Sequence, residues 1–510
     1  MVINMEKYFL GIDVGTSTVK ACCFTSDFHL AAYGKGEYKT YFDRPLYAVQ
    51  EPEDWWRATA DAIKKITKEI EGKGEIAGVA VSSQSPSLIP LDEKGNVLRR
   101  AMIWMDRRAQ AQSDYAANTL IGYERYRRIL KSEPDAYYVL PKMLWYREYE
   151  PKLYEKTKIY LQVNGYIDYK LTGEYSIDLI HAVAVQGMNY EKQKWSKEIE
   201  EAVDIPLREV LPTISKPFDI IGRVTAQAAE ITGLKEGTPV VAGATDTISA
   251  YYGYGMVGDE SAAEMIGTSS ILLFSNSKPL QDCGKLLVKP CPFHRGKEIL
   301  VAAINASGAS VEWLRKLFSE NGGKKLSYEA MNADAAKAAP GAGKLIYFPY
   351  LSGERSPLFN SYAKGMLIGM TSSTGREHLA RAVFEGTSYA VRHNFEEAAK
   401  RGIRPQYVVC AGGGAKSREW LKIKASVLNM PLKVIKENEA DRAALGDAIF
   451  AGIGVGLINT PEEAVKEAVT YEEVIEPNPE WVKIYDKLYP FYRNIYQHLE
   501  GDLRQMEEIT

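Results

Sequence analysis

Residues 11–20, Gly-Ile-Asp-Val-Gly-Thr-Ser-Thr-Val-Lys, lie between two apolar stretches and have the composition of a phosphate-binding turn. Gly15 lacks the Cβ that would keep backbone N–H groups away from an anion. The hydroxyls of Thr16 and Ser17 can add donors, and Asp13 supplies a carboxylate suited to holding Mg²⁺ through water. The segment therefore indicates either a strand–turn–strand loop that binds phosphate and metal or an ordinary polar hairpin.

Asp246 is a second candidate for chemistry, because it follows the apolar run 238–244 and precedes a stretch of small residues. A carboxylate buried there without partners would be costly. One interpretation is a helix N-cap, which is a frequent role for Asp at the end of a strand. The other is a general base for a sugar hydroxyl, because phosphoryl transfer needs an aligned acceptor, a metal and a carboxylate that takes the proton.

Two further glycine-rich segments could contact a nucleotide. Residues 265–270, Met-Ile-Gly-Thr-Ser-Ser, partly repeat the pattern of residues 13–18. Two such hairpins, one in each domain, could hold the phosphates of a nucleotide from both sides of a cleft. The triplet Gly412–Gly414 follows an apolar strand and precedes a helix, where it can either lie flat against a ligand or form a simple tight turn.

Several classes of protein are disfavoured by motifs that the chain lacks. It has no Gly-x-x-x-x-Gly-Lys-Ser/Thr motif, no His-Arg-Asp loop and no Gly-x-Gly-x-x-Gly fingerprint. The sequence therefore does not predict a P-loop protein, a protein kinase or a dinucleotide-dependent dehydrogenase. The cysteines show no disulfide or metal spacing, so we expect buried free thiols in a reducing compartment. They are Cys22, Cys23, Cys283, Cys291 and Cys410.

The bulk composition is that of a globular protein with two large domains. The chain has 510 residues, of which 45% are hydrophobic and 25% charged. Its net charge of −3 implies no general attraction to nucleic acid or to anionic membranes. We find no apolar run long enough for a transmembrane helix and no signal-peptide pattern at the N-terminus, so a cytoplasmic protein is expected.

Strand and helix patterns alternate along the chain, which predicts an α/β fold. The expected strands are 8–24 (a pair), 76–82, 87–91 and 97–104 around a turn at 92–96, 238–244, 264–266 and 270–274, and 408–411. The expected helices are 54–71, most of 114–175, 417–428, 440–454 and the charged tail from 461 onward.

Taken together and in this order, the motifs resemble those of the FGGY carbohydrate kinases, within the sugar kinase–Hsp70–actin superfamily. The resemblance extends from Gly11 to about Gly454. It is carried by residues 11–17, 104–108 (Trp-Met-Asp-Arg-Arg), 243–246 (Gly-Ala-Thr-Asp), 266–269, 306–308, 349–357, 382–386, 411–414 and 444–448.

The resemblance implies two RNase H-like α/β domains that flank a deep cleft. The expected domains are residues 1–250, which bind the sugar, and residues 251–455, which bind the nucleotide. Residues 456–510 are expected to form a helical tail that packs on the body. The cofactors implied are ATP and Mg²⁺, and no nucleic-acid or membrane partner is expected. Relatives are frequently dimers, but the sequence leaves the oligomeric state open.

The resemblance also implies roles for individual residues. Asp246 matches the catalytic base and Asp13 the metal-associated carboxylate. Residues that match the nucleotide site are Thr16, Ser17, Gly267, Thr268, Gly308, Gly412, Gly413, Gly414 and Ser417. Residues that fall in the sugar pocket are Gln84, Trp104, Asp106 and Thr245.

Two of the sugar-pocket residues have plain alternatives. Asp106 could accept two sugar hydroxyls through its two oxygens, or it could form a surface ion pair with Arg107. Trp104 could stack on the C–H face of a sugar, or it could be a core aromatic residue near a hairpin.

The implied activity is ATP-dependent phosphorylation of a small sugar, with a ketopentose such as D-xylulose expected first. Gln84-Ser85-Pro86 stands where typical xylulose kinases of the family carry Met-His-Gly. The Arg-Glu pair of glycerol kinases is absent, which disfavours glycerol. Other ketoses, sugar acids and polyols stay open, as does a non-catalytic, nucleotide-driven clamp. A sugar-responsive DNA-binding regulator is disfavoured by the negative charge.

Overall fold

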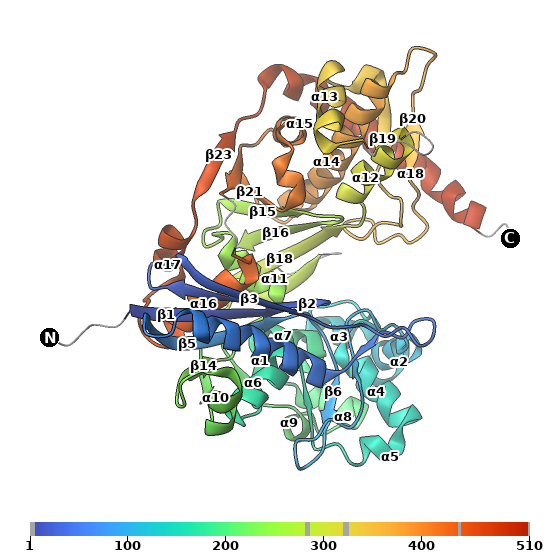
Figure 1. The fold of residues 1–510 in the computed structure, drawn as a ribbon. Coiled ribbons are helices and arrows are strands. Elements are labelled where there is room, and N and C mark those ends of the chain that lie inside the picture. Colours follow the sequence, from blue (N-terminus) through green and yellow to red (C-terminus); the bar gives the residue numbers. More distant parts are fainter. Residues whose placement is uncertain (1–5, 281–285, 320–325, 437–439, 508–510) are drawn as a thin grey trace. The chain divides into compact units, whose positions relative to one another are not determined.

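The computed structural model describes residues 6–280, 286–319, 326–436 and 440–507 (Figure 1). The chain forms two compact units. Unit 1 comprises Met1–Val257, Lys289–Arg295 and Asn438–Val469, and unit 2 comprises Gly258–Val288, Gly296–Glu437 and Thr470–Thr510. The division expected at residues 250 and 455 follows chain order, whereas the units do not. Residues 438–469 belong to unit 1 because the helix α16 (Arg442–Gly454) packs on its sheet.

Unit 1 is built on a six-stranded mixed sheet in the order β13-β14-β5-β1-β2-β3. Strands β1, β2 and β3 are antiparallel neighbours, while β5 runs parallel to both β1 and β14. The predicted strand pair at 8–24 and the predicted strand at 76–82 are confirmed. The strands are β1 Glu6–Val14, β2 Thr18–Thr25, β3 Leu30–Glu37, β5 Gly74–Ser83, β13 Ile220–Arg223 and β14 Pro239–Val241.

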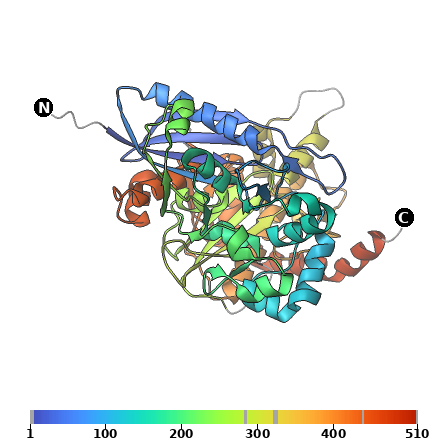
Figure 2. The same ribbon diagram turned by 90° about the horizontal axis from the view of Figure 1, so that it is seen from below.

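Helices cover both faces of this sheet. On one face α1 (Pro52–Glu69) packs against β2 and β3, as the blue helix along the blue strands in Figure 2 shows. On the other face α16 packs against β1 and β5, and α11 (Asp246–Gly253) packs against α16. Gly11 permits this approach, because a Cβ there would lie 1.8 Å from the carbonyl oxygen of Ala444. Asp13 follows Gly11 by two residues along β1, so its side chain lies on the same face of the sheet, the face that α16 covers.

Unit 2 repeats the arrangement of unit 1 with a seven-stranded sheet in the order β17-β18-β16-β15-β21-β22-β23. Three antiparallel strands, β18, β16 and β15, correspond to β3, β2 and β1, and the parallel strands β21 and β22 correspond to β5 and β14. The repeated Gly-Thr-Ser turns therefore occupy equivalent hairpins. The strands are β15 Ser261–Ile266, β16 Ser270–Asn276, β17 Leu287–Pro290, β18 Glu298–Ile304, β21 Tyr407–Ala411, β22 Leu432–Ile435 and β23 Tyr471–Ile475.

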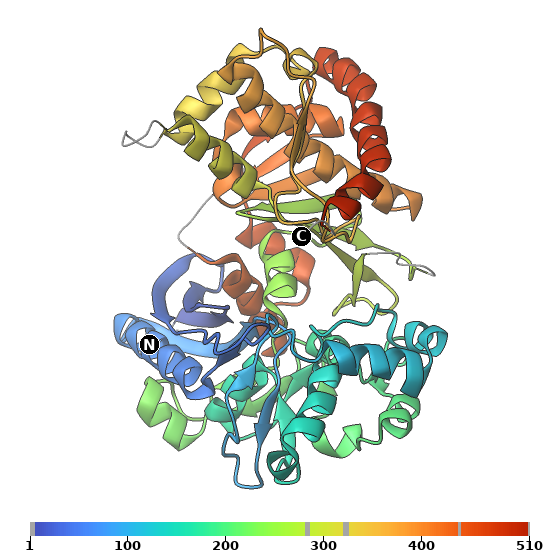
Figure 3. The same cartoon turned by 90° about the vertical axis from the view of Figure 1, so that its right-hand side faces the viewer.

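The helices of unit 2 gather around α14, which is buried along much of its length (Figure 3). The last helix, α18, packs aromatic side chains onto this group, and Tyr389 of α14 contacts the rings of Tyr485, Tyr489 and Tyr492. The helices are α12 Gly308–Phe318, α13 Tyr328–Lys337, α14 Arg376–Lys400, α15 Arg418–Leu428 and α18 Pro479–Glu507. The predicted helices 417–428 and 440–454 are confirmed by α15 and α16.

Two local predictions need correction. The turn at residues 92–96 forms, because the Asp92 carboxylate accepts hydrogen bonds from the backbone N–H groups of Lys94 and Asn96. The strand before it, β6 (Ile89–Leu91), forms its longer ladder with β8 (Ile159–Leu161). The predicted partner 97–104 does lie antiparallel to residues 88–91, but only through isolated bridges, Leu91 with Val97 and Leu88 with Met102. The tail after residue 461 is not wholly helical either, because β23 extends the sheet of unit 2 by pairing with β22.

Four cysteines, Cys22, Cys23, Cys291 and Cys410, are free and buried, as expected. Burial raises the pKa of Cys22 and of Cys23 to about 12, so both thiols stay protonated and unreactive near neutral pH. Cys283 lies outside the described residues. Within the described part of the chain, no helix combines the length and the hydropathy needed to cross a membrane.

Candidate active site

Asp246 is the first residue of α11, and Thr245 precedes it as the N-cap residue without a side-chain capping bond. The N-cap interpretation of Asp246 is therefore wrong. Asp246 Oδ1 accepts hydrogen bonds from the backbone N–H of Thr247 at 2.6 Å and from its hydroxyl at 3.0 Å. Burial raises the pKa of Asp246, while the Thr247 bonds and His181 lower it. A carboxyl group in this setting suits a general base, because its affinity for a proton is higher than in water.

Two more carboxylates of unit 1, Asp13 and Asp441, interact electrostatically with Asp246, and a third, Asp447, interacts with Asp13. Asp13 ends β1, Asp441 caps the first turn of α16, and Asp447 is on the same helix. Burial together with the charges of Asp441 and Asp246 raises the pKa of Asp13 well above its usual value. Lys20 only partly compensates, because its Nζ lies 2.7 Å from Asp441 Oδ2 and 3.9 Å from Asp13 Oδ2.

This cluster includes a buried carboxylate oxygen that is free for a cation. Both oxygens of Asp447 already have donors, because Ser249 Oγ (2.6 Å) donates to one and the Ser82 N–H (3.1 Å) to the other. Asp13 Oδ1, in contrast, is buried and has no hydrogen-bond partner among the described residues. An unpartnered oxygen among like charges fits Mg²⁺, which carries positive charge and takes oxygen ligands. No group of three His, Cys, Asp or Glu side chains in the described ranges could hold a metal alone.

A polar network in unit 1 connects three of the predicted site residues through Gln50. Gln84 Nε2 donates to Gln50 Oε1 at 2.6 Å, and Gln50 Nε2 donates to the carbonyl of Thr16 at 2.6 Å. The indole N–H of Trp104 donates to Thr16 Oγ1 at 3.0 Å. Gln84 Oε1 and Ser85 Oγ are buried without a partner in the described part of the chain. These two oxygens can take hydrogen bonds from the hydroxyls of a small polar ligand.

Asp106 does not have the environment expected for a sugar ligand. Its carboxylate is fully buried and accepts three hydrogen bonds from the guanidinium of Arg108, at 2.6–3.1 Å, and one from the Ala48 N–H at 2.8 Å. The predicted role of taking two sugar hydroxyls is therefore not supported, because both oxygens already have protein donors. The surface pair with Arg107 is wrong too, since Arg107 pairs with Asp135. Asp106 instead anchors the loop that carries Trp104.

In unit 2, the structure brings the predicted nucleotide loops together. The Gly308 N–H donates to the carbonyl of Gly267 at 3.0 Å, and the Ala309 N–H donates to that of Thr268 at 2.9 Å. The start of α12 is thus joined to the β15–β16 turn. Gly412 and Gly414 pack on Ile266, the residue before this turn. Glycine is required at Gly412, where φ is +87°.

Ser417, the last predicted nucleotide residue, is already engaged within the protein. Its hydroxyl donates to Asn332 Oδ1 at 2.7 Å and accepts from the Trp420 N–H at 3.2 Å, which caps α15. Ser17 in unit 1 is exposed at the tip of the β1–β2 turn. Thr245 is buried next to Ser83, with which it forms an isolated parallel bridge.

Comparison with known proteins shows to which family this chain belongs. Residues 8–253 match the N-terminal domain of the FGGY family of carbohydrate kinases, and residues 262–455 match its C-terminal domain. The chain belongs to the FGGY family of carbohydrate kinases. It is therefore a phosphotransferase with an alcohol group as acceptor, and ATP and a sugar are its substrates.

Individual relatives support this membership. The chain is 30% identical over 502 residues to a xylulose kinase of Bacillus subtilis (strain 168), covering 96% of this chain and 97% of that protein. The crystal structure of a xylulose kinase from Rhodospirillum rubrum superposes with a TM-score of 0.89 at 25% identity, covering 98% of this chain and 100% of the other. A gluconate kinase from Lactobacillus acidophilus superposes with a TM-score of 0.90 at 24% identity, covering 98% and 100%, so the fold alone does not identify the sugar.

Three side chains of this FGGY kinase lie near the candidate site residues although no sequence motif marks them. Gln50 lies in a short strand, β4 (Val49–Gln50), and no motif marks it. His181 and Lys289 are isolated in sequence, and only the fold brings them into the electrostatic environment of Asp246. A lone polar residue within an otherwise apolar helix, such as His181 in α7 (Leu179–Val185), is the one signal that could have been followed.

The contact between Gly308 and the β15–β16 turn makes a testable prediction. A Cβ at Gly308 would lie 2.4 Å from the carbonyl oxygen of Gly267, so Gly308→Ala must displace the turn. Overpacking of this kind costs roughly 1–3 kcal/mol, and about 1.4 kcal/mol corresponds to a tenfold change in binding. We expect the Kd for ATP to rise about tenfold. Gly501→Ala is the matched control, because no atom lies within 4 Å of a Cβ at Gly501. Equal ATP affinity in both variants would contradict a nucleotide role for this turn.

Proposed function

We propose that this FGGY kinase transfers the γ-phosphoryl group of ATP to a hydroxyl of a ketopentose, with D-xylulose as the first candidate. The observation that carries the choice of sugar is the 30% identity to a xylulose kinase over nearly the whole chain. The buried, unpartnered Gln84 Oε1 and Ser85 Oγ support a polar acceptor pocket in unit 1. A nucleotide-driven clamp would not need such a pocket, and membership of a carbohydrate kinase family sets that alternative aside.

In the proposed reaction Asp246 acts as the general base. It takes the proton of the acceptor hydroxyl while the hydroxyl oxygen forms a bond to the γ-phosphorus and the bond to the leaving ADP oxygen breaks. Asp13 would hold Mg²⁺ through water, and the bound ion would offset the negative charge of the phosphates. Gly267, Thr268, Gly308 and Gly412–Gly414 would bind the nucleotide. Gln84, Trp104 and Thr16 would orient the sugar and the first phosphate-binding turn.

The test of this proposal is a coupled assay of ADP release over a panel of ketoses, aldoses, polyols and sugar acids. We expect sugar-dependent turnover, with D-xylulose giving the highest kcat/KM. If no sugar raises ADP release above the background, the kinase assignment of this chain fails. If another sugar is preferred, only the choice of acceptor fails. A cytoplasmic location and a homodimer are further parts of the proposal that rest on the family resemblance.

A sugar acid is the second candidate acceptor, and Lys289 in β17 favours it. Lys289 is half-buried, and no hydrogen bond or ion pair joins its Nζ to any residue that the structure describes. Burial lowers its pKa to about 8, while Asp178 and Asp246 raise it. An ammonium group without a close partner could bind the carboxylate of an acidic sugar.

Lys289→Met separates the two acceptors. If Lys289 binds a substrate carboxylate, kcat/KM for D-gluconate should fall about tenfold or more, because a hydrogen bond to a charged group contributes about 1.5–3 kcal/mol. The kcat/KM for D-xylulose should change much less. Lys35→Met, at an exposed position of β3, is the control. Equal losses for both sugars would argue against a carboxylate-binding role.

A further inference from the structure

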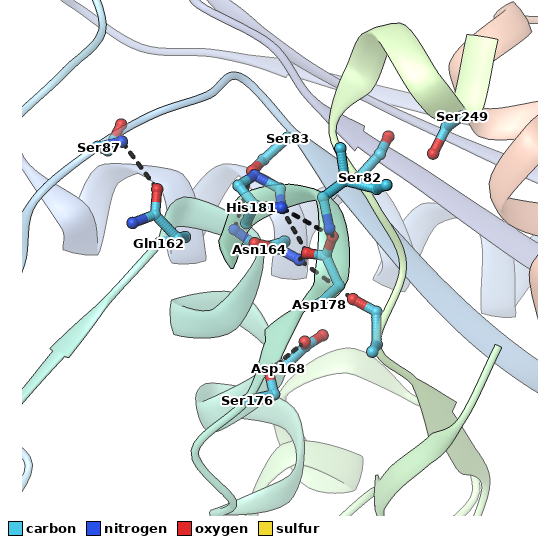
Figure 4. Close-up of polar contacts among 12 residues, drawn as sticks. Ser82, Ser83, Ser87, Gln162, Asn164, Asp168, Ser176, Asp178, His181 and Ser249 are labelled. Atoms are coloured by element: carbon cyan, nitrogen blue, oxygen red, sulfur yellow. Dashed lines mark hydrogen bonds and ion pairs between the residues drawn. The ribbon is translucent and has the colours of Figure 1, made fainter. Parts of the chain in front are cut away.

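A buried polar cluster, formed by Ser83, Asn164, Asp178 and His181, lies beneath the segment that leads into α11 (Figure 4). We call it the His181 cluster, and each of its four side chains is fully buried. His181 Nδ1 is 2.5 Å from Asp178 Oδ2, and His181 Nε2 is 3.2 Å from Ser83 Oγ. Neither His181 nor Asp178 belongs to a motif or to the proposed reaction.

The cluster fixes the imidazole of His181 in one orientation. Asp178 is the N-cap of α7, because its Oδ1 accepts from the backbone N–H groups of Ile180 and His181. Its Oδ2 accepts from Asn164 Nδ2 at 3.0 Å as well as from the ring of His181. An ionised carboxylate only accepts hydrogen bonds, so His181 Nδ1 carries a proton and Nε2 is directed at Ser83.

Backbone contacts connect the His181 cluster to Asp246. The Ser83 N–H donates to the carbonyl of Ala244 at 3.3 Å, and Ser83 forms a bridge with Thr245. Asn164 Nδ2 donates to the carbonyl of Ala242 at 3.1 Å. Gly243 packs tightly on β5, where a Cβ would lie 1.9 Å from the carbonyl oxygen of Val81. The cluster therefore holds the chain on both sides of Gly243, immediately before Asp246.

We propose that His181 is a positioning residue for Asp246. Clamped by Asp178, its ring holds Ser83 and the segment before α11, and so keeps the Asp246 carboxylate aligned for proton transfer. This inference rests on the proposed role of Asp246 as the base. It adds a residue that does not touch the substrate but acts on the group that does.

Charged and polar groups from several elements affect the ionisation of Asp246, and the effect of His181 adds to theirs. On its own helix, Thr247 donates two hydrogen bonds that favour the ionised form. Asp441 of α16 opposes ionisation, as does Asp13 of β1 through their mutual repulsion. Lys289 of β17 favours it. Within this balance His181 lowers the pKa of Asp246, and it does so from inside the fold, where solvent screens the interaction least.

The test measures the ionisation of Asp246 directly, in metal-free protein labelled with ¹³C at the aspartate carboxyl carbons. The Asp246 signal is assigned by its loss in Asp246→Asn. His181→Asn keeps a donor for Asp178 but removes the imidazole ring and its bond to Ser83. We expect this variant to raise the titration midpoint of Asp246 by about one pH unit. The kcat/KM for the sugar should then fall about tenfold on the acidic side of the profile and recover at alkaline pH, with the KM for ATP unchanged.

Two further variants separate positioning from folding. Asp178→Asn can still cap α7, but it loses the carboxylate that holds the ring of His181, so the same shift is expected. Asp168→Asn is the matched control. Asp168 is an equally buried carboxylate of α6 (Val163–Thr172), and its Oδ2 accepts from Ser176 at 2.7 Å. We expect no shift in this control.

The outcomes separate the inference from the proposed function. An unmoved Asp246 titration in folded His181→Asn overturns the inference, and so does a loss of activity that is equal at every pH. If the titration moves but the wild-type protein phosphorylates no sugar, the proposed function fails while the electrostatic coupling stands.

Discussion

Asp246→Asn should lower sugar-dependent ADP release by about 10²–10⁴-fold, the usual contribution of a general base. The amide keeps the shape of the side chain and can still accept from Thr247, but it cannot take a proton from the acceptor hydroxyl. The Kd for ATP should change little, because the residue is assigned to the acceptor and not to the nucleotide. Steady-state kinetics together with direct ATP titration would measure both quantities.

The same variant should not be less stable than the wild type at neutral pH. Burial raises the pKa of Asp246 in the folded protein, so folding favours the protonated form. The stabilisation from this group is fully present below the unfolded pKa of about 4 and is lost as the pH rises through the folded value. An uncharged amide removes that loss. We expect the Tm of Asp246→Asn to equal or exceed that of the wild type near pH 8, with the difference disappearing in acid.

Asp168→Asn again provides the control, because it makes the same substitution at a buried carboxylate in unit 1. It should leave turnover close to the wild-type rate. Near-normal turnover in folded Asp246→Asn would remove Asp246 from the mechanism. A fall in activity that accompanies a lower Tm would instead indicate damage to the fold.

Much of the framework could be predicted from the sequence, because local patterns determine it. The β1–β2 and β15–β16 hairpins follow from apolar runs that flank a Gly-Thr-Ser turn, α15 follows from apolar residues at helical spacing, and α16 follows from a run of small residues. These signals need no knowledge of the tertiary structure. The similarity of the two hairpins also proved informative, because they occupy equivalent places in the two sheets.

What the sequence could not predict depends on partners that are distant along the chain. Asp106 has no marked partner in the sequence, yet the backbone N–H of Ala48, 58 residues away, donates to its Oδ2, and the nearby Arg108 donates to both oxygens. Gln50 joins Gln84 to Thr16 across separations of 34 residues on each side. The periodicity of the sequence does not reveal such pairings, because they depend on which loops lie together at one edge of the sheet. The assignment of residues 438–469 to unit 1 could not be predicted from the sequence for the same reason.

The second large effect is expected at Asp13. Its Oδ1 is buried without a partner in the described residues, among carboxylates that raise its pKa well above the usual value. Asp13→Asn removes the charge that Mg²⁺ would offset. We expect the Mg²⁺ concentration that gives half-maximal turnover to rise about 10–100-fold, the range found when groups that support a metal ion are removed. Titration of Mg²⁺ at a fixed, saturating ATP concentration would measure this shift.

The comparison with Asp447→Asn makes the prediction specific to the metal. Asp447 is as deeply buried as Asp13, and burial raises its pKa well above the usual value too. Both of its oxygens, however, are bonded to Ser82 and Ser249, so this substitution should alter stability and leave the Mg²⁺ dependence unchanged. Asp13→Asn should instead change the Mg²⁺ dependence, with a Tm at neutral pH at least equal to that of the wild type, because the group it replaces is destabilised by its own ionisation. Identical Mg²⁺ titrations for Asp13→Asn and the wild type would exclude Asp13 as the metal-associated carboxylate, and the unpartnered oxygen would then need another explanation.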